Sequence, residues 1–176
     1  MSDGKSAVDR DSCAVVPASG PDDMDRVRAL FQEYHDWLGF DLCFQGFEAE
    51  LASLPGNYAP PGGGLWFARR DDEIGGVVGL RPLETPGGCE LKRLWLRPAF
   101  RGLGLGRRLT ETAIAASKAA GYKGLYLDTL PVMADARRLY ERLGFQAVAP
   151  YYHNPIEGAV YLRLDLTAAQ GSDSAT

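Results

Sequence analysis

The sequence predicts one domain of the α/β or α+β class, in which helices flank a single mixed sheet. The length of 176 residues suits one hydrophobic core. Short apolar runs typical of strands alternate with longer stretches of helical periodicity, and Gly- or Pro-rich turns separate them. There is no internal repeat. The predicted order of elements is β-α-α-β-β-β-α-β-α-β-β.

The first half of the chain contains two predicted helices and four predicted strands. Residues 13–19 read as a strand. A helix follows Pro21, with apolar or aromatic side chains at helical spacing: Met24, Val27, Leu30, Phe31, Tyr34 and Leu38. A shorter helix is expected over 47–54, where prolines and the glycine run 62–64 end it. Residues 65–70 and 74–83 flank an acidic turn and predict a hairpin, and 89–98 predict the next strand.

The second half alternates helices and strands. Residues 104–120 have helical periodicity, with one face expected to hold Leu105, Leu109, Thr112, Ala116 and Ala119. Residues 124–130 predict a short buried strand, 134–145 a helix stopped by Gly144, and 146–152 and 159–166 two closing strands. We therefore expect a domain over 13–166, with loose polar tails at 1–12 and 167–176.

The composition is that of an ordinary globular protein and excludes several classes. The net charge of −4 and the pI of about 5.2 have the wrong sign for a nucleic-acid binder. No apolar run reaches the about 18 residues of a membrane span, and the N-terminus lacks the apolar stretch of a signal peptide. We therefore expect a cytoplasmic protein without nucleic-acid or membrane partners. Its three cysteines form no CxxC pair and are expected to be free thiols: Cys13, Cys43 and Cys89.

One segment is strongly basic. Six basic and no acidic side chains lie between Lys92 and Arg108, which in an acidic protein suggests a compact anionic ligand. Its second half, RPAFRGLGLGRRL, places three glycines between a strand and a helix. Glycines let backbone N–H groups approach a phosphate, and a helix start adds free N–H groups and the positive end of the dipole. The alternative is a glycine-rich loop that only makes a tight turn.

Two common phosphate loops do not fit these glycines. A P-loop requires GxxxxGK[ST], and no Lys-Ser or Lys-Thr pair follows them. A dinucleotide fingerprint requires GxGxxG, but Gly102-x-Gly104 continues to Arg107 and Gly104-x-Gly106 continues to Leu109. The spacing that remains is Arg101-x-x-Gly104-x-Gly106.

With this spacing the sequence resembles the GNAT superfamily of acyl-CoA-dependent N-acetyltransferases, whose signature is [QR]-x-x-G-x-[GA] after a strand and opening a helix. The residues just before it, Leu94-x-Leu96-x-Pro98, match the end of the strand that precedes that signature. Residues 136–145, AxxLYxxLGF, match the second hallmark, and the element order agrees from residue 13 to 166. The resemblance implies the GNAT fold, with a mixed and mostly antiparallel sheet.

The resemblance also implies a cofactor site. Backbone amides across 103–108 would hold the pyrophosphate of acetyl-CoA, and the exposed backbone of 94–96 would pair with the pantetheine like an added strand. The same strand would direct an N–H at the thioester oxygen, where negative charge develops. The implied cofactor-binding residues are Leu94, Trp95, Leu96, Arg101, Gly102, Leu103, Gly104, Leu105, Gly106, Arg107 and Arg108.

The chemistry requires a proton acceptor and a proton donor. A primary alkylamine has a pKa of about 10.4, so at neutral pH it is protonated and cannot attack a thioester. By resemblance Glu90 would be the base, directly or through a water, and Tyr140 the acid for the departing thiolate. The alternative readings are a strand glutamate paired with Lys92 or Arg93, and a core tyrosine with a satisfied hydroxyl.

The remaining reactive residue types are assigned lesser roles. Strand alternation places Cys89 on the face opposite Glu90, so we expect a buried structural thiol and not an acyl-enzyme nucleophile. His35 is expected at the surface or in packing. His153 either borders the acceptor pocket or serves as an alternative base. No His, Cys or Asp cluster has metal-ligand spacing, so no metal is expected.

One position departs from the family pattern. Many members carry an asparagine that contacts the cofactor three positions before the alanine of the LYxxLGF helix. Here that position is Met133. Asp128 or Thr129, at the end of the preceding strand, are the candidates for polar contacts in its place.

The acceptor is predicted only by class. By resemblance it would lie against the first helices and the loop between the last two strands, with Tyr34, Trp37, Tyr152 and His153 as the candidate contacts. We expect a small-molecule amine or an amino-acid-like acceptor, acetylated by direct attack in a ternary complex. A protein or peptide acceptor, a longer acyl group, a hydroxyl acceptor and a non-catalytic acyl-CoA-binding sensor are the alternatives. The chain would be a monomer or a homodimer.

Overall fold

The computed structural model describes residues 12–42 and 46–168, so Cys43 and nearly all of the two predicted tails lie outside the described residues. The strands are β1 Cys13–Pro17, β2 Gly64–Arg70, β3 Glu73–Pro82, β4 Gly88–Leu96, β5 Gly124–Thr129, β6 Gln146–Val148 and β7 Val160–Asp165. The helices are α1 Pro21–Leu38, α2 Phe47–Ser53, α3 Leu105–Ala119 and α4 Ala134–Arg142, with short 3-10 turns η3 Gly56–Tyr58 and η4 Pro98–Phe100. The predicted class and element order are confirmed.

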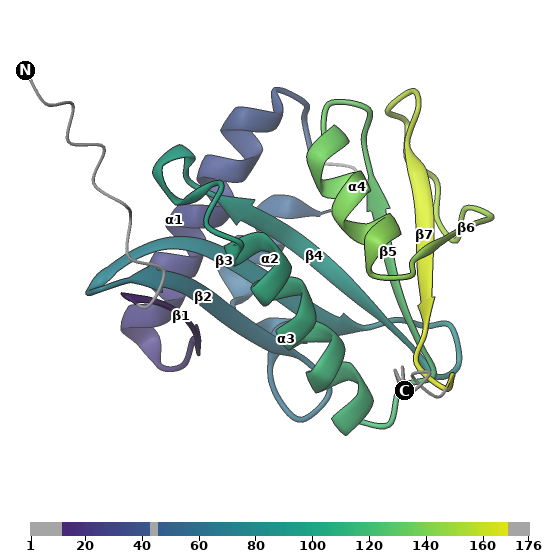
Figure 1. Cartoon of the computed structure of the whole chain (residues 1–176), viewed down its shortest axis with the longest axis horizontal. Coiled ribbons are helices and arrows are strands. Elements are labelled where there is room, and N and C mark those ends of the chain that lie inside the picture. The colour runs from purple at the N-terminus through teal and green to yellow at the C-terminus, as the bar shows by residue number, and fades with distance from the viewer. Residues whose placement is uncertain (1–11, 43–45, 169–176) are drawn as a thin grey trace, which may run out of the picture.

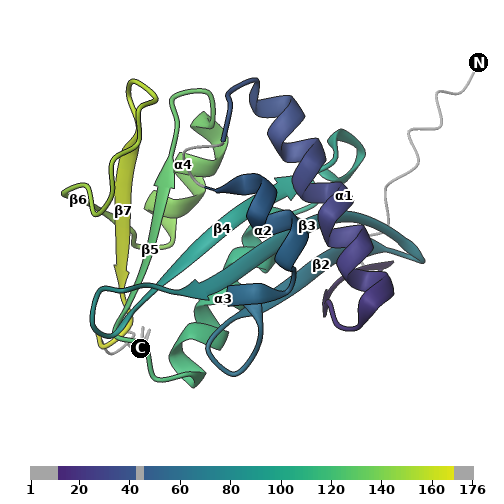
Figure 2. The same cartoon turned by 180° about the vertical axis from the view of Figure 1, so that it is seen from behind.

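The seven strands form one sheet in the order β1-β2-β3-β4-β5-β7-β6. Among the described strands only β4 and β5 pair in parallel, so the sheet is mixed and mostly antiparallel. Helices α1 and α2 cover one face, and α3 and α4 cover the other (Figures 1 and 2). The domain therefore has three layers, with a hydrophobic core on each side of the sheet.

Three predicted strands end two or more residues early in the structure. The strand expected over 13–19 ends at Pro17. The strand expected over 146–152 ends at Val148, so Tyr151 and Tyr152 lie in the loop between β6 and β7. The strand expected over 89–98 ends at Leu96, and Pro98 opens the turn η4. Proline lacks the N–H that a strand ladder requires, which accounts for the early end.

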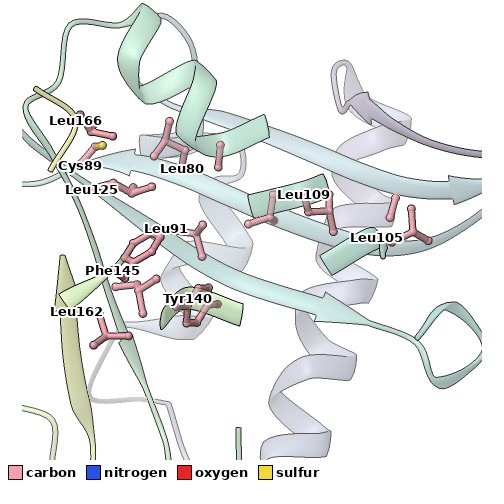
Figure 3. Packing of buried hydrophobic residues seen from close by; sticks show 14 of the residues in the cluster. Leu80, Cys89, Leu91, Leu105, Leu109, Leu125, Tyr140, Phe145, Leu162 and Leu166 are labelled. Atoms are coloured by element: carbon pink, nitrogen blue, oxygen red, sulfur yellow. The ribbon is translucent and has the colours of Figure 1, made fainter. Parts of the chain in front are cut away.

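The buried face of α3 differs from the predicted one. The buried residues are Leu105, Leu109, Thr110, Ala113 and Ser117, and Figure 3 shows the two leucines facing the sheet. The hydroxyl of Thr110 donates to the carbonyl of Gly106 at 2.8 Å, and that of Ser117 donates to the carbonyl of Ala113 at 2.7 Å. Because these polar side chains satisfy their hydrogen bonds within the helix, they pack in the core.

Strands β4 and β5 part from each other partway along their length. Their ladder ends at the pair Glu90↔Tyr126, and beyond it the two strands diverge in both views (Figures 1 and 2). On its other side β4 carries a bulge, because Gly79 pairs with Lys92 whereas Val77 pairs with Trp95. Arg93 at the bulge has a positive φ of 59°. The extra residue lets Lys92 and Arg93, which are consecutive, both face the layer of α1 and α2.

A buried polar network of six residues lies on that face of the sheet: Glu50, Tyr58, Arg81, Glu90, Arg93 and Tyr151. Glu50 accepts hydrogen bonds from the hydroxyl of Tyr58 at 2.7 Å and from Nε of Arg93 at 3.0 Å. Arg81 donates to Oε1 of Glu90 at 2.8 Å and 3.0 Å, and the Tyr151 hydroxyl donates to Oε2 at 2.7 Å. The network joins α2, η3, β3, β4 and the loop after β6.

Replacing Tyr151 with phenylalanine tests this network. We expect Tyr151→Phe to lower the free energy of unfolding by about 1.5–3 kcal/mol, because it removes a hydrogen bond to a buried carboxylate. Tyr122→Phe is the matched control, since its hydroxyl donates to the neutral carbonyl of Gly62 at 2.7 Å. That variant should cost about 0.5–1.5 kcal/mol. Urea unfolding of both variants makes the measurement, and equal losses would contradict the charged character of the Tyr151 bond.

The network also predicts how stability depends on pH. Burial, followed by the charge of Glu90, raises the pKa of Tyr151 well above its usual value. A raised pKa in the folded state contributes stability below the unfolded pKa of about 10, and that stability is lost as the pH rises above this value. The melting temperature should therefore fall above about pH 10. The fall should be shallower in Tyr151→Phe, and identical slopes would show that Tyr151 does not contribute.

Candidate active site

A cleft of about 500 Å³ opens where β4 and β5 diverge. One wall is the backbone and side chains of 91–96 on β4, and the opposite wall is the end of β5 with the start of α4. The glycine-rich turn and the first residues of α3 close one end, and α1 contributes Tyr34 and Trp37. The cleft therefore joins the two sequence hallmarks, which lie more than thirty residues apart in the chain.

The glycine-rich turn presents open backbone to this cleft. Gly102 and Gly104 have positive φ angles of 78° and 76°, and a Cβ at either position would meet nothing within 4 Å. Helix α3 starts directly after Gly104, without a side-chain cap. The N–H groups of its first turn have no acceptor inside the helix, and Leu105 and Gly106 line the cleft. Such a helix start is a suitable site for a phosphate.

Nine of the eleven predicted cofactor-binding residues line the cleft: Leu94, Trp95, Leu96, Arg101, Gly102, Gly104, Leu105, Gly106 and Arg107. Leu103 does not, and packs against the core instead. Arg108 also points elsewhere, because its Nη1 donates to the carbonyl of Cys13 at 2.8 Å. Its backbone N–H is already bonded to the carbonyl of Gly104, at 3.1 Å. The stretch of backbone N–H groups without an acceptor inside the helix therefore ends before Arg108.

Arg101 and the edge of β4 form the next part of the cleft. Nε of Arg101 donates to the carbonyl of Leu96 at 3.0 Å, and its guanidinium lies 5.0 Å from the ring centre of Trp95 and 5.8 Å from that of Trp37. From Leu91 to Leu96, β4 pairs with β3 on one side and borders the cleft on the other. An extended ligand can add to such a strand edge through backbone hydrogen bonds.

The two predicted catalytic residues are placed differently. Tyr140 on α4 lines the cleft, and its ring packs on Phe145 with centroids 5.5 Å apart. Burial raises the pKa of its hydroxyl, so the group stays protonated at neutral pH. Glu90 is only 3% exposed and lies outside the cleft lining. It forms an ion pair with Arg81, directly opposite on β3.

The inner end of the cleft holds three charged residues, of which the sequence singled out only Asp128, as a candidate for polar contacts with the cofactor. Lys92, Arg93 and Asp128 line it. Oδ2 of Asp128 accepts hydrogen bonds from the hydroxyl of Tyr152 and from Nδ2 of Asn154, the latter at 3.0 Å. Its Oδ1 lies 3.8 Å from Nζ of Lys92. Burial lowers the pKa of Lys92, although both Glu90 and Asp128 oppose that shift.

The predicted acceptor contacts fall into two groups. Tyr34 and Trp37 line the cleft, and Trp37 is 43% exposed at its mouth. Burial raises the pKa of Tyr34 to about 12. Tyr152 does not line the cleft, but its hydroxyl donates a hydrogen bond to Asp128, which does. His153 is exposed in a shallow hollow beside the cleft. The structure therefore does not bring His153 into the cleft.

Of the other residues that the sequence pointed to, Cys89 and His35 pack within the fold, whereas Met133 lines the cleft. Burial raises the pKa of Cys89 to about 11, and its thiol donates to the carbonyl of Gly124 at 3.6 Å, as expected for a buried thiol. His35 stacks on Phe47 with ring centroids 4.8 Å apart. Met133 lines the cleft, and the hydroxyl of Thr129 donates to its sulfur at 3.7 Å.

No described helix is long and apolar enough to cross a membrane.

Comparison with known proteins identifies the family. The model of the acetyltransferase (GNAT) family matches residues 24–145. An uncharacterized N-acetyltransferase of Schizosaccharomyces pombe is 45% identical over 150 residues, which cover 84% of this chain and 91% of that protein. Human N-acetylaspartate synthetase is more distant, with 31% identity over 99 residues that cover 56% of this chain and 33% of that enzyme.

A solved structure has the same fold. The structure of yncA from Salmonella typhimurium, solved with its cofactor acetyl-CoA, superposes with a TM-score of 0.67 at 16% identity and covers 93% of this chain and 99% of its own. The match of the family model spans both the glycine-rich turn and the LYxxLGF helix that meet in the cleft. The chain therefore belongs to the GNAT family of acetyltransferases, which take their acetyl group from acetyl-CoA.

Proposed function

We propose that this enzyme transfers the acetyl group of acetyl-CoA to the primary amine of a small, amino-acid-like molecule. The observation that carries the proposal is the single cleft that joins an open glycine turn, the free edge of β4 and Tyr140. These are the three parts that the reaction requires: a pyrophosphate site, a track for an extended thioester, and a proton donor.

The cofactor would lie along the outer wall. Its pyrophosphate binds the first-turn N–H groups of α3 and the glycine backbone at 102–106, where no side chain blocks the approach. Its pantetheine extends along the edge of β4 toward the divergence from β5. Arg101 and Arg107 supply positive charge on this side of the cleft.

The acetyl transfer would proceed by direct attack of the amine on the thioester carbon. A backbone N–H of β4 stabilises the charge that develops on the thioester oxygen. Tyr140 protonates the departing thiolate, a role that fits its position in the cleft wall. The role of Glu90 as proton acceptor stays a prediction that its surroundings do not favour, because Arg81 and Tyr151 already bind its two carboxylate oxygens.

The proposed class of acceptor follows from the residues that line the inner end of the cleft. Tyr34, Trp37 and Asp128 offer aromatic faces and a carboxylate to a cationic amine, whereas Lys92 offers a cation to an acidic group. A zwitterionic amino-acid-like molecule matches both charges. The distant relative N-acetylaspartate synthetase, whose name gives an acetylated amino acid, supports the same class.

Cofactor binding is tested by titration of acetyl-CoA into Gly104→Asp. Wild type should bind in the micromolar range, about −8 kcal/mol, and the variant should not bind, because its carboxylate repels the pyrophosphate at the start of α3. Gly121→Asp at the other end of α3 is the matched control. Gly121 has a φ of 83° and open space around its Cα, as Gly104 has, so the backbone strain is similar.

The control decides how a loss is interpreted. Binding by Gly121→Asp and none by a folded Gly104→Asp would place the pyrophosphate at the glycine turn. If folded wild type ignores both acetyl-CoA and CoA at millimolar concentration, the turn has no cofactor role and the proposed function is wrong.

The chemical step is tested by Tyr140→Phe with a screen of amino acids, diamines and amino sugars as acceptors. Loss of the proton donor should lower kcat by about 10²–10⁴-fold, whereas the affinity for acetyl-CoA should stay the same. Tyr126→Phe on β5 serves as the control, because Tyr126 does not line the cleft. Unchanged turnover in Tyr140→Phe would remove the tyrosine from the mechanism. A protein that binds acetyl-CoA but acetylates no amine would be a binding module.

A further inference from the structure

We propose that Asp128, and not Glu90, is the carboxylate that binds the acceptor's ammonium group and takes its proton. The inner end of the cleft beside Lys92 is then the amine subsite. The inference rests on the proposed acetyl transfer and assigns a step of it to a residue at the end of β5.

The position of Glu90 argues against direct contact with an acceptor. Its side chain is 3% exposed and lies behind the cleft lining. Both carboxylate oxygens are held, Oε1 by Arg81 and Oε2 by Tyr151. A proton taken by this carboxylate would neutralise the partner of Arg81 in a buried ion pair.

Asp128 has the opposite arrangement. It lines the cleft, and Tyr152 and Asn154 both bind Oδ2, which fixes the orientation of the carboxylate. Oδ1 lies 3.8 Å from Nζ of Lys92, which is beyond hydrogen-bond distance. Oδ2 is therefore held by two donors, whereas Oδ1 accepts no hydrogen bond from the described residues and has only the longer ion pair with Lys92.

The neighbours of Asp128 place it at the reaction centre. It lines the same cleft as Tyr34 of α1 and the proposed proton donor Tyr140 of α4, and its charge adds to the effect of burial in raising the pKa of both hydroxyls. The other ionisable groups around it are Lys92 and Glu90 of β4, Tyr151 and Tyr152 of the loop, and Tyr161 of β7. Among the described residues, the carboxylates that line the cleft are Asp128 and the exposed Asp135 at the start of α4, whereas Glu50 and Glu90 do not line it.

The proton balance of the step is complete with these groups. The ammonium gives one proton to Asp128, and the neutral amine attacks the thioester carbon to form the N–C bond. The C–S bond then breaks, and the thiolate leaves with its electron pair and takes the proton of Tyr140. The tyrosinate recovers a proton from the new amide nitrogen. Asp128 finally releases its proton to solvent, so the net products are the amide, CoA thiol and one proton.

The experiment compares acceptors that differ in protonation. Ethanolamine and L-alanine are protonated at neutral pH and require a proton acceptor, whereas hydroxylamine is already neutral. We expect Asp128→Asn to lower turnover of the protonated acceptors by about 10²–10⁴-fold and to affect hydroxylamine far less. Asp72→Asn in the exposed β2–β3 turn is the matched control. Calorimetric titration with acetyl-CoA confirms that each variant is folded and binds the cofactor.

Two further variants separate a proton acceptor from a structural residue. Tyr152→Phe removes a hydrogen bond to Asp128 but leaves the carboxylate, so it should lose less turnover than Asp128→Asn. Lys92→Met removes the cation that favours the ionised carboxylate, so the acidic limb of the rate profile should move to higher pH. Lys92→Arg should keep the limb in place, because the positive charge remains.

Three outcomes would overturn the inference. Glu90→Gln could abolish turnover of the protonated acceptors while Asp128→Asn leaves it intact. Asp128→Asn could slow hydroxylamine as much as ethanolamine, or Tyr152→Phe could match its loss; either result would show a structural role. If the wild type binds acetyl-CoA but acetylates none of the three amines, the proposed function itself fails, and this is distinct from a failure of Asp128 alone.

Discussion

The divergence of β4 from β5 is the constraint on which the rest of the structure depends. The parallel ladder between them stops at Glu90, and the bulge at Arg93 turns the remainder of β4 toward the start of α3. This geometry leaves one edge of β4 bordering a cleft, and it brings the glycine turn and α4 to the two sides of the same space. A straight, fully paired strand would bury these backbone groups in a ladder and close the site.

The same bulge brings two positive charges into a buried layer of the protein. It turns Lys92 and Arg93 to one face of the sheet, where unpaired cations would be costly. Three buried or half-buried acids balance three bases in this layer: Glu50, Glu90 and Asp128 with Arg81, Lys92 and Arg93. The acids come from α2, β4 and β5, so pairing them fixes these elements relative to one another. The charge network thus positions the walls of the cleft.

Most residues predicted to bind the cofactor line the cleft, whereas only two of the four predicted to contact the acceptor do so, and the difference has a physical reason. Gly104, Gly106 and the LYxxLGF helix act through local backbone geometry, which the chain encodes in contiguous residues. The pairs Arg81–Glu90 and Lys92–Asp128 depend on strand register and on a bulge, neither of which leaves a local pattern. Strand alternation correctly placed Cys89 and Glu90 on opposite faces of β4. It could not show that the cleft begins only after Glu90, where the ladder between β4 and β5 ends.

The balance of buried charge also limits what the acceptor can bring into the cleft. An ammonium that stays charged would add a cation to a layer in which acids and bases already match. Transfer of its proton to Asp128 converts an ammonium and a carboxylate into an amine and a carboxylic acid, which removes one charge of each sign. A poorly solvated site disfavours charged forms, so it favours this transfer more than water does. In the proposed mechanism, burial of the layer would therefore help to generate the neutral amine that attacks the thioester.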